Sequence, residues 1–255
     1  MREVSLAVLA LLGACSRREQ AAAVPAASAL AASTVDAGSG AWRYTLEPAA
    51  GAHVDMQGVK ERIRADATGA SGTLEVVPKD LARSRGTVRI DLATLATSTF
   101  HNDDDATQTR HARTWLEVQV GGQTNESMRW AEFAIRSIDG LSASDVSAVA
   151  AQRDGDQDVR TVTMTVHGDL LVHGHTVPNE NAVAVEFHWP AGAPAGSQPG
   201  RVVVKSQQSM RVVLKEFDVR PRDPAGIALA WTTSLISKVA EAADVTVDLG
   251  ATPAP

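Results

Sequence analysis

Histidine and carboxylate groups are the side chains here that could bind a metal ion or transfer protons, and the chain holds 7 histidines. His173 and His175 are two residues apart, so on a strand both imidazoles would lie on one face. A metal site built on them would need a third ligand, such as His188. However, the parity of His167, His173 and His175 is opposite to that of the apolar residues in the same run. We therefore expect these three histidines to face solvent, and we predict no metal site.

A second polar cluster precedes a tryptophan in the middle of the chain. Residues 103–105 are three aspartates, but they lack the glycine and the glutamate at the spacing of a calcium-binding loop, which favours a solvated acidic loop. His101, Arg110, His111 and Arg113 flank this run. Such a cluster could close one end of a barrel and hold the polar head of a ligand.

Motifs of the familiar catalytic classes are missing from the sequence. The chain has no G-x-S-x-G turn, no H-E-x-x-H helix, no phosphate-binding loop and no G-x-G-x-x-G turn. Its single cysteine excludes internal disulfides and multi-cysteine metal sites. The formal net charge of -6, without a long basic run, disfavours nucleic-acid binding. We therefore predict a protein that is not an enzyme and that needs no cofactor.

The first 40 residues have the composition of an export signal and a tether. Residues 1–14 contain one arginine, a short apolar run and small residues, as a secretory signal peptide does. Residues 12–15, LGAC, resemble the lipoprotein box of bacteria, in which the cysteine carries the lipid, and Ser16 after it indicates the outer membrane. Residues 15–40 are rich in Ala and Ser and predict a flexible tether. We expect a lipoprotein anchored through Cys15 at the periplasmic face of the bacterial cell envelope.

Through most of the remaining chain, hydrophobic residues alternate with polar ones, which is the pattern of half-buried β-strands. The clearest runs are residues 88–92, 161–172, 183–189, 210–215 and 245–249, and further candidates are residues 42–46, 53–57, 73–77 and 131–138. Glycine-rich turns separate these runs. We expect one domain over residues 41–250, followed by a disordered tail over residues 251–255.

Two segments break this alternation. Residues 101–115 are polar and predict a loop or a short helix that crosses one end of the fold, and the apolar spacing in residues 226–243 predicts a short helix before the last strand. Many strands in series with few helices favour an antiparallel sandwich or barrel. A barrel of about eight strands either has a filled core or encloses one apolar ligand, and the residues alone leave both possibilities open.

Several segments are similar, in their order along the chain, to one known family. They are residues 42–46 (WRYTL), 69–74 (GASGTL), 86–92 (GTVRIDL), 111–116 (HARTWL) and 166–176 (VHGDLLVHGHT). Over about residues 42–249 the chain resembles the YceI-like domain, a family of periplasmic, polyisoprenoid-binding, lipocalin-like barrels. The resemblance implies an all-β fold, an antiparallel lipocalin-like β-barrel of about eight strands with one or two short helices.

The same resemblance implies a function and a site. The expected function is binding of an amphiphilic lipid, a polyisoprenoid or a quinone-like molecule, in an apolar barrel cavity, as a carrier, a store or a stress-related lipoprotein. His111, Arg113 and Trp115 would form the mouth of this cavity. Its lining would consist of inward-facing apolar residues: Phe133, Ile135, Val162, Met164, Val166, Leu170, Val183, Val185, Phe187, Met210 and Val212.

Two other functions remain compatible with the residues. A filled barrel would be a structural or interaction lipoprotein of the envelope without a small-molecule ligand. An enzyme acting on a lipid, or a redox carrier, would need His53, His101 or His111 for metal or acid–base chemistry. An enclosed apolar volume inside the barrel would favour lipid binding over the filled barrel.

Overall fold

Antiparallel strands form most of the computed structural model, which describes residues 30, 40–58, 62–194, 196–229 and 240–255. The predicted signal peptide, Cys15 and all of the predicted tether except residues 30 and 40 lie outside this described part. Within it, no helix is long and apolar enough to cross a membrane.

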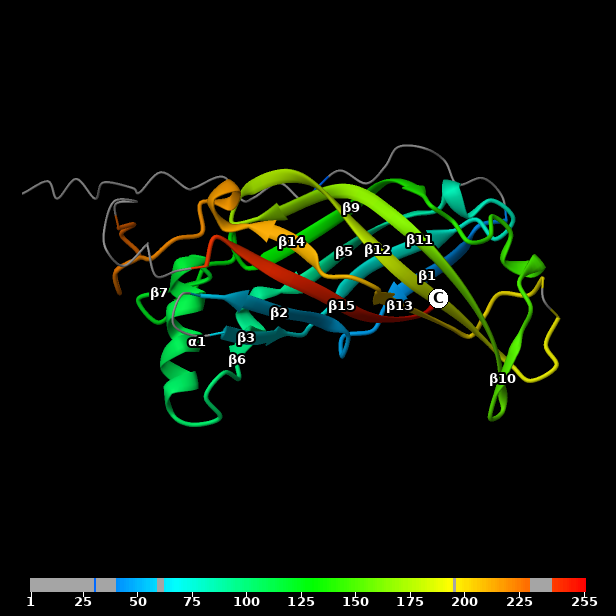
Figure 1. Ribbon diagram of the computed structural model, residues 1–255, viewed down its shortest axis with the longest axis horizontal. Coiled ribbons are helices and arrows are strands. Elements are labelled where there is room, and N and C mark those ends of the chain that lie inside the picture. The colour runs from blue at the N-terminus through cyan, green and yellow to red at the C-terminus, as the bar shows by residue number, and fades with distance from the viewer. Residues whose placement is uncertain (1–29, 31–39, 59–61, 195, 230–239) are drawn as a thin grey trace, which may run out of the picture.

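Eight strands pair side by side and close into a ring, and every pairing is antiparallel (Figure 1). In order around the ring they are β1 (Trp42–Leu46), β4 (Ser71–Val76), β5 (Arg85–Asp91), β9 (Trp130–Asp139), β11 (Gln157–Val172), β12 (His175–Pro190), β13 (Arg201–Ser206) and β15 (Ala242–Pro253). The ring closes where Tyr44 of β1 lies opposite Pro253 of β15 and Leu46 lies opposite Ala251. The expected all-β barrel of about eight strands is confirmed.

Shorter strands extend the sheet beyond this ring. Next to β15 come β2, β3 and β6 in turn, β14 also pairs with β15, and β10 pairs with the start of β11. Two further strands, β7 and β8, form a separate hairpin. The bounds are β2 (Gly51–Gln57), β3 (Arg62–Ala67), β6 (Ala96–Thr97), β7 (Gln119–Val120), β8 (Gln123–Thr124), β10 (Gln152–Asp154) and β14 (Met210–Val213).

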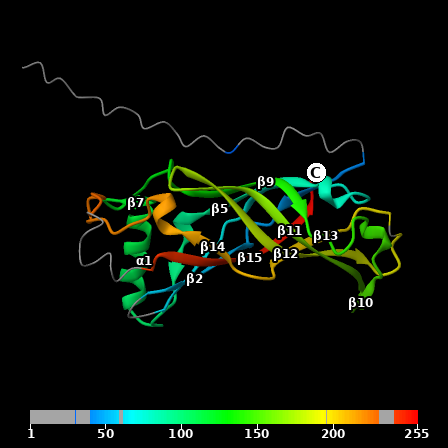
Figure 2. The same ribbon diagram turned by 45° about the horizontal axis from the view of Figure 1, so that its top comes forward.

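One α-helix, α1 (Asp104–Trp115), stands across one end of the barrel, as both views show (Figures 1 and 2). Of the two alternatives expected for residues 101–115, a loop or a short helix, the structure has the helix. Single turns of 3-10 helix make up the remaining helical structure of the described part: η1 (Leu81–Arg83), η2 (Leu92–Thr94), η3 (Val146–Ala148) and η4 (Leu214–Phe217).

The longest hairpin of the fold joins β11 to β12, each 16 residues long. Its register runs from Gln157 opposite Pro190 to Val172 opposite His175. The two residues of the turn, His173 and Gly174, have φ values of 51° and 75°, as a tight turn that matches the twist of the strands requires. Apolar side chains of both strands alternate into the barrel, because successive residues of a strand point to opposite faces.

Aromatic residues fill the barrel at the end near β10. The rings of Trp42 and Trp189 meet edge to face with centroids 6.3 Å apart, and Phe187 lies 6.2 Å from Trp189. The Trp189 indole N–H donates to the carbonyl oxygen of Ser197 at 2.8 Å. Burial raises the pKa of the neighbouring Tyr44 phenol above its ordinary value, so that this hydroxyl stays protonated. This end of the barrel therefore has a packed core.

Two boundary predictions need correction. Residues 251–253 are the end of β15 and pair with β1, so the segment 251–255 is not a disordered tail throughout. The helix predicted over residues 226–243 falls largely on residues 230–239, outside the described part, and its last two residues, Ala242 and Ala243, already belong to β15.

Candidate functional site

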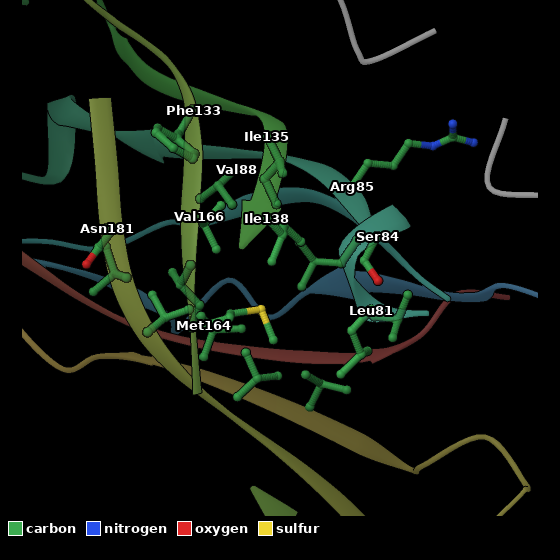
Figure 3. A pocket seen from close by; sticks show the side chains of 18 of the residues that line it. Leu81, Ser84, Arg85, Val88, Phe133, Ile135, Ile138, Met164, Val166 and Asn181 are labelled. Atoms are coloured by element: carbon green, nitrogen blue, oxygen red, sulfur yellow. The ribbon is translucent and has the colours of Figure 1, made fainter. Parts of the chain in front are cut away.

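A cavity of about 140 Å³ lies between the strands of the ring, and we call it the central cavity (Figure 3). Its walls include inward-facing aliphatic side chains of the ring strands, with Met164 and Val166 of β11 beside Val183 and Val185 of the neighbouring strand β12. These four side chains are all buried. The ring therefore encloses apolar space in addition to its packed aromatic end.

A larger cavity of about 320 Å³ lies beneath α1, and we call it the helix-side cavity. Its walls come from the ring, from the strand extension β2–β3–β6 and β14, from η4 and from the helix itself. Trp115 and Leu116 line it from the end of α1, and Phe217 lines it from η4. His111 also lines it and is exposed, so the cavity reaches the surface beside the helix.

The two cavities adjoin each other across a single layer of side chains. Val88, Phe133, Met210 and Val247 line both of them. These residues come from four different strands, β5, β9, β14 and β15. An elongated apolar molecule could therefore lie along the barrel and occupy both spaces if this layer moved aside.

Polar groups are few along these walls. In the central cavity they are Glu75, Ser84, Arg85 and Asn181, and an ion pair of 2.6 Å between Arg85 and Glu75 neutralises the two charges. In the helix-side cavity they are Thr97, Gln108, His111 and Glu132. Because the remaining lining is almost wholly hydrocarbon, the combined space suits a long apolar group. Gln108 and His111 of α1 are among the polar residues of the helix-side cavity.

Hydrogen bonds from the preceding loop fix α1 over the helix-side cavity. The Asp105 carboxylate accepts the backbone N–H of Phe100 at 3.0 Å and of His101 at 2.7 Å. These bonds hold the pKa of Asp105 below its ordinary value, and the bond from Phe100 has the largest effect. Further along the helix, the Arg113 Nε donates to the carbonyl oxygen of Leu95 at 2.9 Å. The helix is therefore held at both its beginning and its end.

The closed ring, the crossing helix and the cavities agree with a comparison of sequences. Residues 44–251 match the family model of the YceI-like domain. The chain belongs to the YceI-like domain family. No curated protein matches it.

The solved structures found to be similar to this YceI-like domain share little of its sequence. A polyisoprenoid binding domain from Saccharophagus degradans, implicated in plant cell wall breakdown, is 14% identical with a TM-score of 0.49, over 83% of this chain and 98% of that one. BcnA from Burkholderia cenocepacia is 14% identical with a TM-score of 0.47, over 80% of this chain and 96% of that one.

In this YceI-like domain the residues predicted to line a cavity come together. All of them except Val162 line the central cavity, the helix-side cavity or both. Val162 is fully buried in the core but lines neither space. Of the three residues predicted at the mouth, His111 and Trp115 line the helix-side cavity, whereas Arg113 does not, because its guanidinium turns to Leu95.

The prediction that three histidines face solvent is wrong for His173. This residue is only 5% exposed, whereas His175 is exposed and His167 is half-buried. The His173 ring places Nδ1 2.9 Å from the carbonyl oxygen of Phe217 and Nε2 2.7 Å from a carboxylate oxygen of Glu117. The parity rule fails here because His173 lies in the turn after β11, where a positive φ redirects the side chain.

No metal site joins the histidines in the described part of the YceI-like domain, where no three His, Cys, Asp or Glu side chains gather around a common point. The rings of His173 and His175 stack with centroids 6.1 Å apart. His188, the third ligand considered from the sequence, lies near the opposite end of β12.

Sequence reasoning missed three residues that surround the His173 ring. Glu117 follows α1, and Asp218 and Arg222 follow η4. Glu117 is 56 positions from His173 along the chain, and Arg222 is 49. A charged residue in a loop is ordinarily solvated, and no local pattern marks those whose partners come from distant elements. Only the fold brings them together.

Proposed function

We propose that this YceI-like domain binds an amphiphilic isoprenoid lipid, with its tail inside the ring of strands and its head beside α1. The observation that carries the proposal is the pair of adjoining apolar cavities, of about 140 and 320 Å³, that share a lining of four residues. The proposal needs no catalytic group, since burial of the tail supplies the binding free energy.

The energetics of such burial are favourable. Each buried methylene contributes about 0.8 kcal/mol, so a tail of about 15 to 20 carbons contributes more than about 10 kcal/mol before the costs of association. The hydroxyl or carbonyl of a lipid head finds polar partners in Thr97, Gln108 and His111 beside α1. A polyisoprenoid alcohol or a quinone-like molecule has this combination of a long tail and a small polar head.

We also propose that the domain acts at a membrane, anchored through a lipid on Cys15 at the periplasmic face of the outer membrane. The sequence of residues 12–15 and the Ala/Ser-rich segment after it support this placement. Replacement of Cys15 by serine would then release the protein into the soluble fraction of the cell. Retention of the Cys15→Ser variant in the membrane fraction would overturn the anchor.

A pair of tryptophan substitutions tests the cavity directly. In Met164→Trp the indole would fill the central cavity, because Met164 is buried on its wall. The matched control is Thr161→Trp, on the same strand but exposed on the outer face. All-trans-retinol is a suitable probe, since it is an isoprenoid alcohol whose fluorescence rises in apolar surroundings.

We expect retinol to bind the wild type and the Thr161→Trp variant alike, and to bind Met164→Trp at least tenfold more weakly. Thermal unfolding of each variant shows whether it is folded. Equal retinol binding by both variants, or no retinol binding by the wild type, would overturn the proposal.

A further inference from the structure

A partly buried polar cluster connects the end of α1 to the sheet beside the helix-side cavity. The cluster includes His173, with its contacts to Phe217 and Glu117 described above. It also includes Arg222, whose Nη1 atom lies 3.2 Å from a carboxylate oxygen of Glu117. The other terminal nitrogen of Arg222, Nη2, donates to Asp218 at 3.2 Å. The side chains of His173 and Arg222 are 3% and 7% exposed. We call these four residues, Glu117, His173, Asp218 and Arg222, the clasp.

The backbone of the clasp is strained. Among the described residues, four that are not glycine have φ in the left-handed region, and three of them belong to the clasp. Glu117, His173 and Asp218 have φ values of 52°, 51° and 51°. Glycine or asparagine is preferred in this conformation, because a Cβ crowds the following carbonyl. The contacts of the clasp must therefore offset the strain at three positions, an arrangement that is typical of functional sites.

The three strained residues connect the clasp directly to the helix-side cavity. Each of them comes immediately after a residue that lines this cavity. The lining residues are Leu116, Val172 and Phe217. They lie at the end of α1, at the β11–β12 turn and at the end of η4, so that release of the clasp would free three parts of the wall at once.

Both nitrogens of the His173 ring lie close to oxygen atoms that accept hydrogen bonds, an arrangement that favours a proton on each nitrogen. Nδ1 lies 2.9 Å from the carbonyl oxygen of Phe217, which can only accept, so Nδ1 carries a proton. Nε2 lies 2.7 Å from a carboxylate oxygen of Glu117, which also pairs with Arg222, so a proton on Nε2 donates to that oxygen. With a proton on both nitrogens the ring is an imidazolium, and Glu117 is the carboxylate that it contacts.

Further charged groups lie near the ring, and the Nη2 atom of Arg222 is 3.5 Å from the Nε2 atom of His173. Arg220 pairs with Asp218 at 3.0 Å. His175 stacks on the His173 ring across the turn, and Lys215 and Glu216 of η4 are exposed. Loss of the Nε2 proton would leave a lone pair facing a carboxylate in a buried place, where such a contact is strongly unfavourable.

We propose that the clasp is a proton-dependent latch on the helix-side cavity. With His173 protonated, the latch holds α1 and η4 against the β11–β12 turn, and with His173 neutral it releases them and opens the cavity. Histidine is the side chain that ordinarily changes charge between about pH 5 and 8, so lipid exchange should be slow at low pH and fast at high pH. The consequence for lipid exchange rests on the proposed function, whereas the latch itself does not.

Transfer of retinol from the protein to phosphatidylcholine vesicles measures exchange, since neither the probe nor the lipid headgroup titrates in this range. We expect the transfer rate of the wild type to rise about tenfold from pH 5.5 to pH 8.5. The His173→Gln variant should transfer retinol fast at both pH values. The control is His53→Gln, which removes an exposed histidine that also pairs with a carboxylate, Asp66, and it should behave as the wild type does.

A measurement without lipid tests the latch on its own. The ¹⁵N signals of the His173 ring should show both nitrogens protonated at pH 5.5 and one at pH 8.5. Hydrogen exchange of the Val219 amide, which donates to Leu214 at 3.0 Å, should be faster in His173→Gln than in the wild type at pH 5.5.

The outcomes are distinct. A His173 ring that is neutral at pH 5.5, or a transfer rate that does not depend on pH, would overturn the latch. If retinol does not bind at all, the proposed function fails, and the ring protonation together with Val219 exchange still decides whether the latch exists. If His173→Gln does not fold, Glu117→Gln, which removes the negative charge that favours the Nε2 proton, takes its place and should also transfer retinol fast at pH 5.5.

Discussion

The ring of Phe133 in β9 occupies the space that a side chain at Gly168 of β11 would need. A Cβ on Gly168 would meet the Phe133 ring and the backbone oxygen of Ala134 at less than contact distance. At this point the register between β9 and β11 shifts, between His167 and Gly168. Phe133 thereby reaches the layer that separates the two cavities, so the glycine determines where the barrel is divided.

A methyl group at this position should therefore destabilise the fold. We expect Gly168→Ala to lower the free energy of unfolding by about 1–3 kcal/mol, because the backbone on the other side cannot yield. Urea denaturation measures this loss. Gly200→Ala is the matched control, since nothing lies within 4 Å of a Cβ there, and its stability should be that of the wild type. Equal stability of the two variants would contradict the contact.

A larger side chain in the layer between the two cavities should weaken the binding of long lipid tails more than that of short ones. Val88→Phe adds bulk where the two cavities meet, so a tail would be confined to the helix-side cavity. We expect its affinity for solanesol, a long isoprenoid alcohol, to fall about tenfold or more, and its affinity for farnesol, a short one, to change little. Competition with retinol measures both. An equal loss for the two alcohols would show that the tail does not pass this layer.

The Asp91–Arg129 pair should make stability depend on pH in the acid range. Arg129 donates to both carboxylate oxygens of Asp91, at 2.9 and 2.7 Å, and these bonds hold the pKa of Asp91 below its ordinary value. The stabilisation is therefore complete above about pH 4 and is lost as the pH falls through the lowered pKa. We expect Asp91→Asn to cost about 1.5 kcal/mol at pH 7 and progressively less as the pH falls below about 4. A difference from the wild type that does not fall with pH would contradict this assignment.

The aromatic end of the barrel should contribute more to stability than the outer surface does. Trp189 is 2% exposed and packs on Trp42, so Trp189→Ala should cost about 3–5 kcal/mol. Trp130 is half-buried on the sheet, with the guanidinium carbons of Arg89 and Arg129 4.5 and 5.2 Å from its ring centre. We expect Trp130→Ala to cost about 1 kcal/mol. Thermal unfolding compares the two variants, and similar losses would be inconsistent with a packed aromatic end.

The strands that the sequence predicts well are those with large apolar residues at every second position. The alternation in residues 161–172, which belong to β11, is easily recognised because large residues, valine, methionine and leucine, face the barrel. β3 was missed because its inward positions after Ile63 are alanines, Ala65 and Ala67, which give a weak signal. β13 was missed because Val202 and Val203 are both buried, so the alternation disappears.

The same physical distinction separates the parts of the candidate site that the sequence predicts from those that it does not. Its lining was predictable, since a position such as Val185 is one of a series that faces inward at every second residue. The clasp was not, because a turn with positive φ at His173 breaks the parity, and its partners are set by tertiary structure. Periodicity carries information along one element, whereas contacts between loops depend on how the elements pack.

The central claim is that the barrel holds a long-chain lipid, and the most direct measurement is mass spectrometry of the organic extract of protein purified from bacteria without detergent. We expect about one long-chain isoprenoid or quinone-like lipid per chain in the wild type and in Thr161→Trp, and little or none in Met164→Trp. A wild-type protein that carries no lipid and also takes up no added isoprenoid would contradict the account, and would indicate a barrel that serves an envelope structure or a protein partner.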